Sequence, residues 1–194
     1  MTRSSADDSA VSPALLAVRR RAEVLVTADA VQQAIDRVSV RLALSLAAEN
    51  PLLLAVLHGG LPFAGELLKR LAFPLELGYV HVSRYGDATR GGTLRWHSRP
   101  DYPMEGRTVL LVDDIFDRGE TLAALRSWAI EQGARRVVTA VLVDKVVDVQ
   151  RPLQVDFAAL SCPDRYLFGC GMDYRGYWRN LPSIYALPES MESA

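Results

Sequence analysis

The chain has 194 residues, 49% of them hydrophobic, and a formal net charge of −1 from 22 Lys and Arg against 23 Asp and Glu. This length and composition are typical of one soluble globular domain and exclude the fibrous and intrinsically disordered classes. The balanced charge lacks the positive field of nucleic-acid-binding proteins, so no nucleic-acid partner is expected. Charge or proline interrupts every apolar stretch short of a membrane span, and the first residues lack the apolar run of a signal peptide, which favours a cytoplasmic protein without a membrane partner.

The N-terminal quarter predicts a tail, a short strand and a long helix. Residues 1–12 are rich in Ser, Asp and Ala without periodicity and are expected to be disordered. Ala22–Val26 is a candidate strand, and Thr27 has the character of an N-cap for a helix that runs to about Ala48. One face of this helix carries apolar residues at helical spacing, namely Val31, Ile35, Val38, Leu42 and Leu46. Asn50-Pro51 ends the helix.

Three apolar runs predict strands that are buried on both faces: Leu52–Leu57, Thr108–Val112 and Val137–Val143. Helices are expected after the first two, over Phe63–Leu71 and over Thr121–Gln132. Strands and helices that alternate at these lengths predict βαβ units, and hence an α/β fold with a central parallel sheet flanked by helices. Ligands bind such sheets at the carboxyl ends of the strands.

The remaining segments predict a loop and a smaller β-rich part. A strand is expected over Leu75–Arg84, and the Gly, Thr and charged residues that follow, to Thr93, favour a mobile loop. Shorter apolar pieces follow Pro152 and predict a small β-rich hood over the strand ends: Val155–Leu160, Leu167–Cys170 and Ser183–Leu187. A single domain is therefore expected over residues 13–188, with a core at about 22–150, a hood at 151–188 that includes an N-terminal contribution, and a frayed end at 189–194.

Two adjacent acids, Asp113 and Asp114, follow the second buried strand. Their carboxylates are expected to reach solvent, because burial would cost several kcal/mol. Gly119 then supplies backbone freedom, and the amides of about Asp117–Thr121 open a helix N-terminus, which is a ready anion site. Carboxylates for sugar hydroxyls or a cation, beside an anion cradle, suit a sugar phosphate. The alternative is that these acids only cap the helix and solvate a loop.

The string Val112–Leu122, VDDIFDRGETL, resembles the phosphoribosyl-diphosphate signature of the type I phosphoribosyltransferase family. Further segments resemble the hypoxanthine-guanine members of that family, in the family's order from about Glu23 to Pro188: Leu57–Gly60, Tyr85 with its glycine-containing loop, Val143–Lys145, Cys162–Tyr166 and Asp173–Pro182. The resemblance implies the fold of that family and a purine salvage enzyme. Such an enzyme converts hypoxanthine or guanine and 5-phosphoribosyl 1-diphosphate (PRPP) into IMP or GMP and diphosphate, with Mg²⁺ as cofactor and commonly as a dimer or tetramer.

The resemblance also implies a role for each matching residue. The paired acids of the family bind the ribose hydroxyls and organise magnesium, roles that fall on Asp113 and Asp114, with Asp173 near the metal. Asp117 is implied near purine N7, where it shares the proton as N9 attacks the anomeric carbon. Tyr85 is implied as the catalytic contact of a closing loop. The residues implied for PRPP and its phosphates are His58, Gly59, Gly60, Asp113, Asp114, Asp117, Arg118, Gly119, Glu120, Thr121, Arg84 and Arg179.

Five residues are implied around the base. Lys145 would donate to the purine 6-oxo group and Tyr166 would stack on the ring, with Ile115 beside them. Backbone groups of Leu167 and the side chain of Asp173 would lie near the purine 2-position. Taken alone, such a Lys is more often a solvated surface residue and such a Tyr more often packs against the core or its rim, so only the joint pattern assigns them.

The sequence departs from the family's pattern at the phosphate side. His58 stands where many relatives have Lys, Arg118 where Thr is common, and Glu120 where Lys often sits. Arg118 and Arg84 are expected to restore the lost positive charge. Two alternatives stay open, a xanthine-preferring enzyme and, less favoured, a nucleotide-sensing regulator on the same fold. The three histidines are scattered along the chain and the two cysteines form no CxxC pair, so no structural zinc site is expected.

Overall fold

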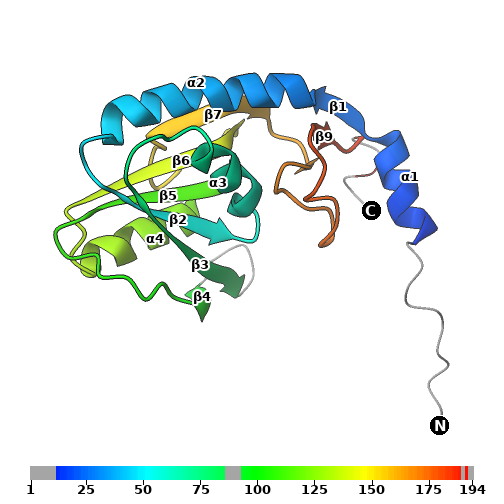
Figure 1. Cartoon of the computed structure of the whole chain (residues 1–194). Coiled ribbons are helices and arrows are strands. Elements are labelled where there is room, and N and C mark those ends of the chain that lie inside the picture. The colour runs from blue at the N-terminus through cyan, green and yellow to red at the C-terminus, as the bar shows by residue number, and fades with distance from the viewer. Residues whose placement is uncertain (1–11, 86–92, 189–190, 192–194) are drawn as a thin grey trace, which may run out of the picture.

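A six-stranded sheet forms the centre of the protein in its computed structural model, which describes residues 12–85, 93–188 and 191, without the side chains of residues 84, 85, 93 and 94 (Figure 1). The elements run along the chain as α1 (Pro13–Arg21), β1 (Glu23–Val26), α2 (Ala28–Leu46), β2 (Leu52–Leu57), α3 (Gly60–Leu68), β3 (Glu76–Tyr85), β4 (Thr93–Ser98), β5 (Thr108–Phe116), α4 (Glu120–Glu131), β6 (Arg136–Val146), β7 (Phe157–Pro163), β8 (Leu167–Phe168) and β9 (Ile184–Ala186). The sheet order is β4-β3-β2-β5-β6-β7, and only β3 and β4 pair antiparallel. The predicted α/β fold with a central, mostly parallel sheet is confirmed.

Helices cover both faces of this sheet, with α2 and α3 on one side and α4 on the other (Figure 1). Along β5, alternate residues serve the two layers: Leu110 packs in the cluster of α2 and α3, and Leu111 packs in the cluster of α4. The strands are therefore apolar on both faces, as predicted. The Thr27 hydroxyl accepts a hydrogen bond from the amide of Ala30 at 3.4 Å, which confirms the N-cap of α2.

Several strand and helix ends differ from the predicted ones. β5 continues beyond Val112 to Phe116, because its ladder with β6 continues through Asp113 and Ile115. β6 extends to Val146, so Lys145 lies within the strand and not after it. α3 begins at Gly60, three residues earlier than predicted. In β5 and β6, backbone hydrogen bonds to the neighbouring strand thus continue the strand past polar side chains that predicted its end.

The hood is a small antiparallel sheet of order β1-β9-β8, which lies beside the central sheet (Figure 1). The expectation that the segment at residues 155–160 belongs to the hood is wrong. This segment contributes to β7, which pairs parallel to β6 at the edge of the central sheet, for example through Val143 and Leu160. Both strands are apolar and run in the same direction, so the pairing extends the central core.

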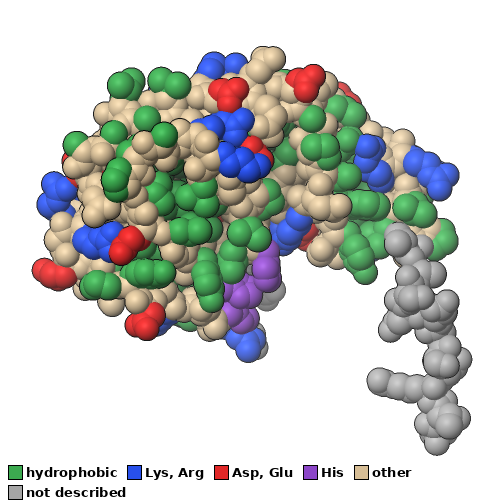
Figure 2. Space-filling model, in the orientation of Figure 1, with side chains coloured by type: hydrophobic (Ala, Val, Ile, Leu, Met, Phe, Trp, Pro, Cys, Tyr) green, Lys and Arg blue, Asp and Glu red, His purple; other side chains and the backbone are tan. Residues whose placement is uncertain are grey.

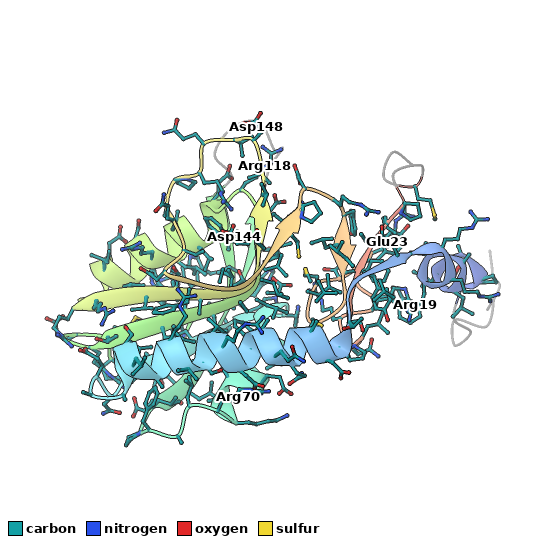
Figure 3. All side chains as sticks on the ribbon, turned by 90° about the horizontal axis from the view of Figure 1, so that it is seen from above. Arg19, Glu23, Arg70, Arg118, Asp144 and Asp148 are labelled. Carbon is teal, nitrogen blue, oxygen red and sulfur yellow. The ribbon has the colours of Figure 1, made fainter. Side chains whose placement is uncertain are left out.

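Helix α1 was not predicted. Its one buried side chain, Val18, packs against Phe168, Tyr185 and Leu187 of the hood. The Arg19 guanidinium lies 4.0 Å from the centroid of the Tyr185 ring and donates to its hydroxyl at 2.7 Å. Figure 3 shows Arg19 and Glu23 at this N-terminal side of the molecule. Ser12-Pro13, an N-cap residue followed by proline at the first helical position, is the sequence signal for this helix.

Some predicted features lie outside the described residues. They are the disordered tail except for Ser12, most of the frayed C-terminus, and residues 86–92 of the expected mobile loop. Among the described residues, no helix is long and apolar enough to cross a membrane.

Candidate active site

Asp113 and Asp114 lie near the carboxyl end of β5, and their exposed fractions are only 9% and 8%. The expectation that they reach solvent is wrong, because the strand continues past them and the hood covers this edge. The amide of Asp114 donates to Oδ1 of Asp113 at 2.9 Å. Burial, and then the charge of Asp114, raise the pKa of Asp113 well above its ordinary value, and burial also raises the pKa of Asp114. A bound cation would relieve both effects.

The segment that follows these acids encloses a cavity of about 370 Å³. Its lining is continuous in sequence, from Asp113 to Leu122, and so includes the predicted Ile115, Asp117, Arg118, Gly119, Glu120 and Thr121. Gly119 has a φ of 79°, and a Cβ there would lie 2.5 Å from the Phe116 ring, so glycine is required. Helix α4 begins directly after it, and the N-terminal end of a helix beside a cavity suits an anion. Figure 3 shows Arg118 at this end of the sheet.

The glycine pair after β2 packs directly against the acids. A Cβ on Gly59 would lie 2.0 Å from Oδ2 of Asp114, and one on Gly60 would lie 2.4 Å from the carbonyl oxygen of Val112. The hood approaches the same point, since a Cβ on Gly171 would lie 2.1 Å from the carbonyl oxygen of Gly59. Backbone groups of the turn are thereby held beside the paired carboxylates, in a place where side chains do not fit.

Arg179 connects the hood to the acids. Its guanidinium donates to the carbonyl oxygen of Gly171 at 2.6 Å, pairs with Asp173 at 2.5 Å and lies 3.9 Å from Oδ2 of Asp114. Arg179 therefore links Asp173 of the hood to the adjacent pair of Asp113 and Asp114. Among the described residues, no group of three or more His, Cys, Asp or Glu side chains converges as metal ligands. Two adjacent carboxylates still suit Mg²⁺, which commonly takes one or two protein ligands and completes its shell with water and substrate phosphates.

A second cavity of about 210 Å³ adjoins the first and shares Asp114, Ile115 and Asp117 with it. The remaining lining brings together the predicted base-side residues with two that were not predicted: Lys145, Tyr166, Leu167, Asp173, Arg165 and Met172. The Lys145 ammonium is buried between two carboxylates, 2.7 Å from Asp164 and 3.6 Å from Asp117. The Tyr166 hydroxyl donates to the carbonyl oxygen of Asp173 at 3.2 Å. Cationic side chains and one aromatic ring thus line a space beside the cavity that follows Asp113 and Asp114.

Arg151 supports the acidic segment and was missed in the sequence. Its guanidinium donates to Oδ1 of Asp144 at 2.6 Å and to the carbonyl oxygen of Phe116 at 3.3 Å, and it lies 4.4 Å from the centroid of the Phe116 ring. Nothing in the sequence distinguishes it from a solvated arginine. The side chains of Arg84 and Tyr85, both predicted site residues, lie outside the described part of the structure.

Comparisons with known proteins agree with this geometry. Residues 22–175 match the model of the phosphoribosyl transferase domain. The hypoxanthine-guanine phosphoribosyltransferase of Streptococcus pneumoniae is 33% identical over 172 residues, which cover 88% of this chain and 96% of that protein. A solved hypoxanthine phosphoribosyltransferase from Staphylococcus aureus shares the fold with a TM-score of 0.85 at 24% identity, over 92% of this chain and 98% of that one. A solved hypoxanthine-guanine-xanthine phosphoribosyltransferase has a TM-score of 0.74 at 29% identity, over 87% and 95% of the two chains. The chain therefore belongs to the phosphoribosyltransferase family.

Proposed function

We propose that the protein is a purine salvage enzyme that transfers the phosphoribosyl group of PRPP to hypoxanthine or guanine and forms IMP or GMP and diphosphate. The observation that carries this proposal is the pair of adjoining cavities that share Asp114, Ile115 and Asp117. One cavity has an anion cradle at the start of α4, and the other has Lys145 and Tyr166. A base and a sugar phosphate bound side by side would meet at Asp117. The relative from Streptococcus pneumoniae supports the same substrates by its name.

The residues at this junction suit the transfer. The bond from purine N9 to the anomeric carbon forms as the bond from that carbon to diphosphate breaks, so positive charge develops on the ribose. The Asp117 carboxylate would accept the N7 proton and stabilise this charge. Lys145 would hold the 6-oxo group and Tyr166 the face of the ring, which orients N9. Amides of the Gly59-Gly60 turn and Arg179 would bind the departing diphosphate.

The proposed cofactor of this reaction is Mg²⁺. The carboxylate oxygens of Asp113 and Asp114 are hard ligands of the kind that Mg²⁺ prefers. Burial raises the pKa of both acids, so a bound cation would stabilise their ionised forms. Asp173 would take part from the hood side once Arg179 turns towards diphosphate. When bound, the ion would neutralise charge on the leaving diphosphate.

A direct assay tests the function. The purified protein is incubated with PRPP, Mg²⁺ and one of hypoxanthine, guanine, xanthine, adenine or uracil, and nucleotides are separated by chromatography. IMP and GMP are expected, and failure to convert any 6-oxopurine would contradict the proposal. The second candidate is a xanthine-preferring enzyme, which the 29% identical hypoxanthine-guanine-xanthine enzyme keeps open. A higher kcat/KM for xanthine than for the other two bases would select it.

Replacing Lys145 with Gln is expected to raise the KM for hypoxanthine by about 10- to 100-fold, because a hydrogen bond to a charged group contributes about 1.5–3 kcal/mol. The KM for PRPP should change little, since Lys145 lies on the base side. Steady-state kinetics with each substrate varied in turn measures both values. Lys69→Gln is the matched control, because that side chain is 69% exposed at the end of α3. Equal effects on both KM values would argue against base recognition by Lys145.

Replacing Gly59 with Ala is expected to raise the KM for PRPP by at least about tenfold, equivalent to about 1.4 kcal/mol. The added methyl group would lie 2.0 Å from Oδ2 of Asp114, so either the turn or the carboxylate must move. The control is Gly65→Ala on α3, where a Cβ meets no heavy atom within 4 Å. A PRPP titration of both variants, with circular dichroism to verify folding, makes the comparison. A Gly59→Ala enzyme with unchanged KM would show that the turn does not contact PRPP.

The assembly and location complete the proposal: a homo-oligomer, either dimer or tetramer, in the cytoplasm. Four exposed apolar side chains, Leu61, Leu77, Tyr79 and Tyr102, line one cavity of about 520 Å³ beside α3 and β3. Exposed apolar groups gathered in this way are typical of association surfaces. Light scattering after size exclusion gives the mass of the wild type and of Leu61→Glu. A wild type that is monomeric at assay concentrations would contradict the oligomer, and cell fractionation tests the location.

A further inference from the structure

The three histidines of the chain lie in one row, although they are scattered in the sequence. His58 follows β2, while His81 and His97 lie on β3 and β4. His side chains, purple in Figure 2, gather at one edge of the molecule. The ring centroids of His58 and His81 are 4.4 Å apart, and those of His81 and His97 are 4.5 Å apart. Nε2 of His97 lies 2.7 Å from the Ser83 hydroxyl. We refer to His58, His81, His97 and Ser83 as the histidine row.

The row is a product of strand pairing. Leu57, the last residue of β2, is the neighbour of His81 across the parallel pair, and the antiparallel pair of β3 and β4 brings His97 to the same edge. One end of the row is exposed at His58, directly before Gly59 and Gly60, whose backbone packs against Asp114 and Val112. The row therefore ends at the turn to which the proposed function assigns diphosphate.

The charged groups around the row are mixed in sign. Asp114 lies across Gly59 on β5, with Arg179 of the hood 3.9 Å from it. On β4, Arg95 is the cross-strand neighbour of Ser83. Beyond β4, Arg99 lies over the Trp96 ring at 4.6 Å, and with Asp101 it lines the cavity beside Leu57.

Within the row, positive charge is least favourable at the middle ring, His81. Protonation of all three imidazoles at these separations is unfavourable, because like charges this close repel one another. Burial, and then the neighbouring His58 and His97, lower the pKa of His81, which keeps the middle ring neutral. His58 is exposed and faces only one ring of the row. A neutral middle ring in edge contact can hold the outer ring in place while the outer ring gains a proton.

We propose that His81 and His97 are positioning residues that hold His58 against the diphosphate group of PRPP, and that His58 takes up a proton from solvent when this anion binds. The inference rests on the proposed function, which assigns diphosphate to the neighbouring turn. An anion bound beside the exposed His58 ring would favour the protonated form of that ring, because a nearby opposite charge stabilises the charged form. A lysine at position 58 would be charged throughout the neutral pH range. The histidine row makes diphosphate binding dependent on pH.

Proton nuclear magnetic resonance tests the proton uptake directly. Since the chain has only three histidines, every imidazole C–H signal belongs to the row, and single substitutions assign each one. The tag-free protein is titrated from pH 5.5 to 8.5 with and without inorganic diphosphate, in the presence of Mg²⁺. The signal that disappears in His58→Asn is expected to shift its pKa upwards by about one unit, equivalent to about tenfold in diphosphate affinity between the protonated and neutral forms. An unchanged His58 titration in a protein that binds diphosphate would overturn the inference.

Kinetics tests the positioning role. In the wild type, the KM for PRPP is expected to rise by up to about tenfold from pH 6 to pH 8. This rise should be absent in both His58→Lys and His58→Asn. Of these two variants, His58→Lys should have the lower KM for PRPP. His81→Ala should raise the KM for PRPP with little change in kcat, and His81→Phe should restore it by keeping the ring contact. If His81→Ala does not fold, His81→Phe and the two His58 variants still decide the question. If the KM for PRPP depends on pH equally in wild type and His58→Asn, the inference is wrong, but the proposed function is unaffected. If no nucleotide forms, the proposed function is wrong, and the resonance titration still tests the histidine row.

Discussion

Replacing Asp117 with Asn is expected to lower kcat by about 10²- to 10⁴-fold, the range that general acid–base catalysis contributes. Asp117 is shared by the two cavities, and its half-exposed carboxylate lies 3.6 Å from the Lys145 ammonium. Asn preserves the shape of this side chain but can neither accept the N7 proton nor stabilise positive charge on the ribose. The KM for PRPP should change little, because the anion cradle is made of backbone amides, which this substitution keeps.

Steady-state and single-turnover kinetics with hypoxanthine measure these effects. Asp148→Asn is the control, since that acid is exposed in the loop after β6 and lies outside both cavities (Figure 3). A kcat that falls no further than in the control would remove Asp117 from the chemical step. A large rise in the KM for PRPP with unchanged kcat would instead make it a ground-state contact.

Replacing Asp113 with Asn is expected to stabilise the ligand-free protein at neutral pH while removing most of its activity. Burial and the charge of Asp114 make an ionised Asp113 unfavourable in the native state. Asn is uncharged, and its amide oxygen can still accept the 2.9 Å hydrogen bond from the Asp114 amide. For a chain of this size, each kcal/mol added to the free energy of unfolding raises Tm by about 2–4 °C. Activity is expected to fall because the variant lacks one of the two carboxylates that we propose bind Mg²⁺ and the ribose.

The pH dependence of this effect follows from the direction of the pKa shift. Because the native pKa of Asp113 is raised, the native state holds the proton more tightly than the unfolded chain does. The contribution of Asp113 to stability is therefore fully present below its ordinary pKa of 3.8 and is lost as the pH rises through the raised native value. The Tm difference between Asp113→Asn and wild type should widen as the pH rises through this window.

Calorimetric scans at several pH values, with and without Mg²⁺ and PRPP, measure the stability differences. These ligands should raise the Tm of the wild type more than that of Asp113→Asn, because binding to the native state stabilises it in proportion to affinity. A variant that is less stable than the wild type at pH 7.5 without ligands would show that the acid pair carries no unfavourable charge.

Much of the fold and of the site could be predicted from local sequence. The apolar runs of β2, β5 and β6 predict buried parallel strands. Thr27 marks the start of α2 because its hydroxyl can cap the helix, and Gly119 marks the start of α4 because glycine allows the turn before it. The order of strands and helices then brings the segments after β2 and β5 to one edge of the sheet. Lys145 and Tyr166 could be placed near the acids only through the resemblance to a family, because neither residue type indicates a ligand on its own.

Only the tertiary structure determines how the paired acids are buried. In the sequence Asp113 and Asp114 predict the end of a strand, but pairing with β6 carries the ladder past them and the hood closes above them. Their perturbed pKa values follow from that enclosure and are invisible in the sequence.

The sequence by itself determined the α/β class, the acidic segment and the glycine pair, because each depends on residues within a few positions of one another. The tertiary structure decided the pairing of β1 with β9, the place of β7 in the central sheet, and the meeting of the three histidines. These features join residues that are far apart along the chain, such as Glu23 and Ala186. Their free energy comes from packing and hydrogen bonding between distant segments, which local periodicity and turn chemistry do not encode.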